Sequence, residues 1–97
     1  MRIIAKRTLR DYWESHPTAE EPLNSWYRIV KGEDWDSPAD VKARFPKASI
    51  VGDNRAVFNI RGNDYRLIVQ INYPRRIVYV RFMGTHAEYD RIDAREV

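Results

Sequence analysis

The feature that most constrains the fold is a change to alternating periodicity after residue 50. Three β-rich runs follow one another, at Ala56–Ile60, Tyr65–Asn72 and Ile77–Met83, and short polar segments join them. Successive side chains of a strand point to opposite faces, and short connections join antiparallel neighbours. We therefore predict a three-stranded antiparallel meander, with residues 50–51 as a further strand at its edge.

Helical spacing dominates the first half of the chain. Apolar residues recur at i, i+3 and i+4 in two segments, which predicts two amphipathic helices. Their apolar residues are Leu9, Tyr12 and Trp13 in the first segment, and Leu23, Trp26, Tyr27 and Val30 in the second. The first helix is expected to end near His16 and Pro17, and the second at Gly32.

The remaining boundaries follow from capping residues. The second helix has two candidate starts, a Thr18-x-x-Glu21 capping box or Pro22 in the first turn. Ser37 before Pro38 predicts the N-cap of a short third helix that stops before Pro46. Residues 2–4 are predicted as a short first strand, and Thr85 with Glu88 as a capping box that opens a terminal helical turn or two.

Together these elements predict one α+β domain spanning residues 1–97, with the helices packed on one face of a small antiparallel sheet. The 97 residues are 43% hydrophobic and include three tryptophans, which is enough for a core without covalent staples. The lack of cysteine excludes disulfides, thiolate ligands and cysteine nucleophiles. Neither a secretion signal nor a membrane span is recognisable, so a cytoplasmic location is expected.

The alternation also predicts which side chains share a face of the sheet. One set is wholly apolar and should meet the helices: Phe58, Ile60, Leu67, Val69, Ile71, Val78, Val80 and Phe82. The opposite set mixes arginines, amides and an aromatic: Arg55, Val57, Asn59, Arg61, Arg66, Ile68, Gln70, Asn72, Ile77, Tyr79, Arg81 and Met83. Val57, Ile68 and Ile77 are expected to be exposed and to hint at a protein partner.

The polar face has the composition of an RNA-binding surface. Between Arg55 and Arg81 the chain holds six arginines against the single Asp64. Arginine forks match phosphate geometry, amides read base edges and tyrosine stacks on bases, so single-stranded RNA fits such a face. A merely solvated sheet face would also be polar, but there both signs of charge normally intersperse.

His86 is the one residue with clear potential for acid–base chemistry. It occupies the first position of the predicted terminal helix, with Tyr89 on its face and Asp90 one turn away. The helix N-terminus disfavours the imidazolium and the nearby carboxylates favour it, so the ring could donate or accept a proton. The alternative is an ordinary surface histidine. His16, at a helix end, is expected to have no chemical role.

Metal and cofactor sites are not expected. The two histidines lie seventy residues apart with no carboxylate motif between them, and the isolated glycines form no phosphate-binding loop.

Several segments resemble the HigB toxin family in order along the chain. They are Val57-Phe58-Asn59-Ile60-x-Gly62-Asn63-x-Tyr65-Arg66-Leu67, Tyr79-x-Arg81-Phe82 and Gly84-Thr85-His86-x-Glu88-Tyr89-Asp90, preceded by Lys31-Gly32, Trp35 and Pro38-x-Asp40-Val41-Lys42. The resemblance implies a RelE-like fold and a type II toxin that cleaves mRNA in the ribosomal A site. It also implies neutralisation by HigA, a helix-turn-helix antitoxin, and metal-independent attack of a ribose 2′-OH on the adjacent phosphate.

The resemblance also implies roles for individual residues of this chain. Arg66 and Arg81 would stabilise the phosphate, His86 would act as acid or base, and Tyr89 would assist it. The expected RNA-binding residues are Arg61, Asn59, Tyr79 and Arg55, with Lys42 and Lys47 as contacts to substrate or ribosome.

Two other functions stay open from the sequence. One is a non-catalytic nucleic-acid-binding module, and the other is a ParE-like toxin that acts on DNA gyrase with the same architecture. A gyrase poison need not combine phosphate-binding arginines with a histidine-tyrosine turn, which favours the endonuclease.

Overall fold

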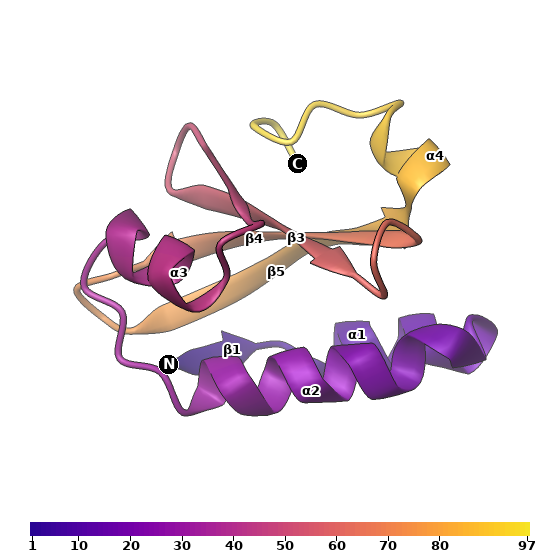
Figure 1. Cartoon of the computed structure of the whole chain (residues 1–97), viewed down its shortest axis with the longest axis horizontal. Coiled ribbons are helices and arrows are strands. Elements are labelled where there is room, and N and C mark those ends of the chain that lie inside the picture. The colour runs from indigo at the N-terminus through magenta and orange to yellow at the C-terminus, as the bar shows by residue number, and fades with distance from the viewer.

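The computed structural model describes residues 1–97 as an α+β fold built on a five-stranded sheet (Figure 1). The elements in chain order are β1 (Arg2–Ile4), α1 (Lys6–Ser15), the 3₁₀ turn η1 (Pro17–Ala19), α2 (Glu20–Lys31), α3 (Pro38–Arg44), β2 (Ser49–Val51), β3 (Arg55–Ile60), β4 (Tyr65–Asn72), β5 (Ile77–Thr85) and α4 (His86–Tyr89). No helix is both long and apolar enough to cross a membrane.

The sheet order is β1-β5-β4-β3-β2, and every pairing is antiparallel except that of β1 with β5. The predicted meander of β3, β4 and β5 is confirmed, as are the edge strand β2 and the short first strand β1. The parallel docking of β1 against β5 was not predicted, because a three-residue strand carries no signal of its partner. With β1 paired to β5, the helices α1 and α2 that follow it lie on one face of the sheet (Figure 1).

Local signals set most helix boundaries. α1 ends before Pro17, whose ring cannot continue it, and α2 then begins at Glu20 after a 3₁₀ turn rather than at either predicted cap. α2 ends at Lys31 with Gly32 as its C-cap, although the glycine φ of −86° is one that any residue adopts. Ser37 is the N-cap of α3 and Pro38 its first residue, as predicted, but the serine side chain makes no capping hydrogen bond.

The main core lies between the sheet and helices α1 and α2. Sixteen buried residues form one cluster, centred on aromatic contacts of Phe58 with Trp26 and Phe45 at ring-centroid distances of 5.4 and 5.0 Å. Burying a side chain of this size stabilises the fold by about 1.5–3 kcal/mol. The alternating apolar residues of β3 and β4 thus bury the face that the sequence predicts.

A β-bulge in β5 changes the faces beyond it. Ile68 pairs with Phe82 and Val69 with Val80, so Arg81 has no partner in the register. One extra residue reverses the alternation of everything after it. The predicted faces of Phe82 and Met83 are therefore wrong: Met83 packs against the main core, and Phe82 lies on the opposite face.

The C-terminal segment, residues 90–97, covers part of the face opposite the helices (Figure 1). Val57 and Ile68 were expected to be exposed, but they are 3% and 0% exposed because Ala94 packs on them. Phe82, Tyr89, Ile92 and Val97 are among the partly buried residues around this second cluster. The face is therefore open only on either side of the C-terminal segment.

Candidate active site

Helix α4 presents His86 through a complete capping box. Thr85 Oγ1 accepts a hydrogen bond from the Glu88 backbone N–H at 3.2 Å, and Glu88 Oε1 accepts one from the Thr85 backbone N–H at 2.7 Å. The hydrogen bond from the Thr85 backbone N–H is the largest cause that lowers the pKa of the Glu88 carboxyl, and the hydrogen bond with the Thr85 side chain is the second. The His86 backbone N–H donates to Asp64 O at 3.1 Å, which ties the short helix to the β3–β4 turn.

His86 is paired with an acid on its own helical face. Its Nδ1 lies 3.1 Å from Asp90 Oδ2, at the i, i+4 spacing, and the histidine side chain is 48% exposed. The carboxylate can accept a hydrogen bond from Nδ1–H and fix the orientation of the ring, as carboxylates do for catalytic imidazoles. The ring is thus accessible to a substrate and arranged for proton transfer.

Arg66 supplies a positive charge without an acidic partner beside this pair. Its guanidinium donates to Tyr65 O at 3.2 Å and to Asn63 Oδ1 at 3.3 Å, and it lies 5.9 Å from the centre of the Tyr89 ring. It forms no salt bridge, unlike Arg61, which pairs with Asp64 at 2.8 Å. A guanidinium held by neutral acceptors and an aromatic face retains its attraction for a phosphate.

Arg81 belongs to a second group on the same face. Its Nη2 donates to Gln70 Oε1 at 2.7 Å, and its guanidinium lies 5.9 Å from the centre of the Tyr79 ring. Gln70 is four residues from Arg66 along β4, a distance of about 13 Å. Between the two groups lies the row of Val57, Ile68 and Phe82 under the C-terminal segment.

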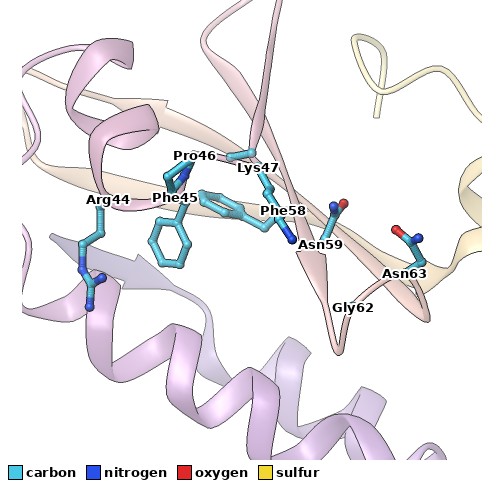
Figure 2. A pocket seen from close by; sticks show the side chains of 9 residues that line it. Arg44, Phe45, Pro46, Lys47, Phe58, Asn59, Gly62 and Asn63 are labelled. Carbon is cyan, nitrogen blue, oxygen red and sulfur yellow. The ribbon is translucent and has the colours of Figure 1, made fainter.

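Asn59 and Lys47 line a cavity at the edge of the site (Figure 2). Asn59 is the cross-strand partner of Arg66, and the cavity of about 510 Å³ lies between residues 44–48 and the β3–β4 turn. Neither Asn59 nor Lys47 uses its side chain in a hydrogen bond within the protein, so both are free to contact a ligand.

Three predicted RNA-binding residues are engaged elsewhere. Arg55 is 7% exposed, and its donors meet Val97 O and Asp53 Oδ2, so it is not accessible to RNA in this structure. Lys42 donates from Nζ to Pro46 O and Ala48 O, both at 2.7 Å. Arg61 forms a surface ion pair worth at most about 1 kcal/mol, which a phosphate could displace.

Three neighbours of the site were not among the residues predicted to act in it. Asp90 carried the clearest signal, since it follows His86 at the spacing that brings side chains together on a helix. Gln70 lies on the predicted polar face with Arg81, but the register that brings the two side chains into contact does not follow from the sequence. Asn63 lies in a turn, and no pattern predicts that its amide would hold Arg66. No group of three or more histidines, cysteines or acids is gathered as a metal site.

The sequence of this chain is similar to one known family and to several named proteins. The sequence model of the HigB_toxin family, described as the RelE-like toxic component of a toxin-antitoxin system, matches residues 19–92. The "mRNA interferase HigB" of Escherichia coli O6:H1 is 29% identical over 94 residues, covering 95% of this chain and 91% of the relative. The "mRNA interferase toxin HigB" of Escherichia coli K12 and the "mRNA interferase HigB" of Shigella flexneri are each 28% identical over 92 residues, covering 93% of this chain and 88% of each relative.

Proposed function

Because this chain belongs to the HigB toxin family, RelE-like toxic components of toxin-antitoxin systems, we propose that it is an mRNA interferase that cleaves mRNA on the ribosome. The family implies an antitoxin as partner. We infer that this antitoxin is a HigA-type helix-turn-helix protein and that residues 1–97 act as one toxin domain in the cytoplasm. The mRNA interferase names of the relatives disfavour both a gyrase poison and a non-catalytic module.

The observation that carries the proposal is the pairing of His86 with Asp90 next to the unpaired charge of Arg66. In the proposed reaction, His86 removes the proton from a ribose 2′-OH. The 2′-oxygen then bonds to the adjacent phosphorus, the bond from phosphorus to the 5′-oxygen breaks, and Tyr89 protonates that oxygen. The products are a 2′,3′-cyclic phosphate and a 5′-hydroxyl.

Arg66 has the position to stabilise the phosphorane, whose charge exceeds that of the starting phosphate. The two rings that would move protons, His86 and Tyr89, come from the same turn of α4. Arg81 lies beyond the Val57, Ile68 and Phe82 row, so we assign it to a flanking phosphate, with Tyr79 as a stacking partner for a base. The reaction as written calls for no metal ion.

The proposed dependence on the ribosome is supported by the small number of catalytic groups in this site. One histidine, one tyrosine and one nearby arginine leave much of the substrate's orientation unspecified, and orientation alone contributes large rate factors. A programmed ribosome would hold the mRNA in place. We therefore expect mRNA in a translating complex to be cut at least about 10-fold faster than the same RNA free in solution.

Primer extension on a reporter mRNA after brief induction tests the proposal. The wild type should produce cuts within translated codons, and coexpression of the antitoxin should remove them. His86→Gln should reduce cutting by at least about 100-fold, the usual contribution of a general acid or base. His16→Gln is the matched control, since that ring stacks on Tyr12 with the ring centroids 4.1 Å apart and has no part in the proposed proton transfers. Growth arrest with intact mRNA would overturn the proposal.

A further inference from the structure

The cavity between residues 44–48 and the β3–β4 turn has the size of a ligand site (Figure 2). Its volume of about 510 Å³ falls within the range of about 300–1,000 Å³ for small-molecule pockets. That is room for one nucleotide. Its lining comes from two separate segments, residues 44–48 and 58–63, so the fold rather than one continuous motif creates it.

One wall of the cavity is a supported aromatic surface. Phe45 is partly exposed, and its ring packs edge-on against Phe58 at 5.0 Å and against Trp35 at 6.2 Å. Phe58 and Trp35 are both almost fully buried, so the Phe45 ring is held from behind. A fixed aromatic ring beside a polar opening is what single-stranded RNA-binding proteins use to stack a base.

Two asparagines line the other side of the cavity. Asn59 and Asn63 are both exposed, and each side-chain amide can donate and accept at the edge of a base. Asn63 Oδ1 already accepts from Arg66 Nη2 at 3.3 Å, which leaves the Asn63 NH₂ group to donate. Asn59 has both functions free. The pair could therefore distinguish one base from another.

The charges around the cavity favour an anion. Arg44 and Lys47 line it, neither forms a salt bridge, and no acidic residue is part of the lining. Arg44 also lies 5.9 Å from the centre of the Phe45 ring. A nucleotide combines an aromatic base with a phosphate, which matches an aromatic wall, two amides and two unpaired cations.

The cavity adjoins the candidate active site through Asn63, which lines the cavity and holds Arg66. We propose that it binds the nucleotide next to the cleaved phosphate, with the base read by Asn59 and Asn63 and a phosphate held by Lys47. This inference rests on the proposed function and adds to it a determinant of sequence preference.

Mapping of cleavage ends in wild type, Asn59→Ala, Phe45→Leu and Lys47→Met tests this subsite. In Asn59→Ala and Phe45→Leu, the preference for one base at a position beside the cut should fall about 10-fold, while total cleavage falls less. Lys47→Met should lower cleavage at all sites. Asn24→Ala, an asparagine on α2 away from the cavity, is the control. An unchanged base preference in both Asn59→Ala and Phe45→Leu would overturn the inference.

Binding can be measured without cleavage. Titration of the toxin with each of the four ribonucleoside 5′-monophosphates should shift the NMR signals of residues 44–48 and of the Asn59 and Asn63 amides. Lys47→Met should weaken this binding about 5-fold or more. If mRNA is cut but no nucleotide shifts these signals, the subsite is wrong and the proposed function stands. If the signals shift but mRNA is never cut, the nucleotide site stands and the endonuclease does not.

Discussion

Arg55 holds the main-chain oxygen of Val97 with two donors, Nε at 3.0 Å and Nη2 at 2.6 Å. An arginine that the sequence places on an RNA-binding face thus fastens the C-terminal segment across that face. The contact also helps to keep Val57 and Ile68 buried, because it anchors the end of the segment that packs on them.

Replacing this anchor should release the segment. Arg55→Met removes hydrogen bonds from a buried charged group, so the free energy of unfolding should fall by about 1–3 kcal/mol in urea denaturation. Amide hydrogen exchange in residues 91–97 should accelerate as well. Arg75→Met, at an exposed turn position without an ion pair, is the control. Unchanged exchange in the segment would show that apolar packing alone retains it.

Phe82 leaves no room for a side chain at position 84. A Cβ at position 84 would lie 2.6 Å from Phe82 Cζ and 3.2 Å from Glu88 Oε1. Gly84→Ala should therefore cost about 1–3 kcal/mol of stability through overpacking, and Phe82→Leu in the same chain should recover part of the loss. Gly32→Ala is the matched control, because its Cβ would meet nothing closer than 3.6 Å at an ordinary φ. Thermal unfolding of the variants measures both effects.

The hydroxyl of Tyr12 is buried and has no hydrogen-bond partner. Tyr12→Phe should leave stability at pH 8 within about 1 kcal/mol of wild type, because no hydrogen bond is lost. Burial, with smaller contributions from Glu88 and Tyr65, raises the pKa of Tyr12 to about 12. Its ordinary value is near 10, so the unfolded chain loses this proton first, and stability should fall between about pH 10 and 12.

Unfolding measured at pH 8 and pH 11 separates the two effects. The wild type should lose more stability than Tyr12→Phe over this interval, and Tyr27→Phe should behave like wild type. Equal losses in wild type and Tyr12→Phe would contradict the role assigned to the buried phenol.

Glu88 should make the order of α4 dependent on pH in the acid range. The hydrogen bonds with Thr85 lower the pKa of the Glu88 carboxyl. The stability that the ionised carboxylate adds to α4 is therefore fully present above the ordinary glutamate pKa near 4.3, and it is lost as the pH falls through the lowered pKa. Below about pH 4 the Thr85 amide NMR signal should therefore move. In Glu88→Gln the amide oxygen can still accept, so the signal should stay constant. Glu96→Gln should titrate like wild type.

Asp90→Asn tests the orientation of His86 within the proposed mechanism. Removing the charge 3.1 Å from Nδ1 should lower the cleavage rate about 10- to 100-fold, while RNA binding in the His86→Gln background changes little. Asp93→Asn, which pairs with Arg95, provides the same chemical change outside the site. A rate equal to wild type would remove Asp90 from the mechanism.

The sequence predicted the α+β class, the meander and the α4 capping box because each depends on local or periodic signals. Phe82 and Met83 were placed on the wrong faces because a bulge leaves no mark in an alternating run. The cover over Val57 and Ile68 was missed for a different reason: residues 90–97 have no period, so nothing predicts where they pack. The roles of Arg66, Arg81, His86 and Tyr89 stay predictions that the proposed variants test.

The unpaired position of Arg81 in the β4–β5 register has an evolutionary consequence. A chain lacking this one residue would pair Val80 and Phe82 with Val69 and Ile68 in unbroken succession, and every side chain would keep its present face. Arg81 is thus an extra residue that a regular strand does not need. Among relatives, a single-residue gap at this place should coincide with loss of the cation rather than with loss of the fold.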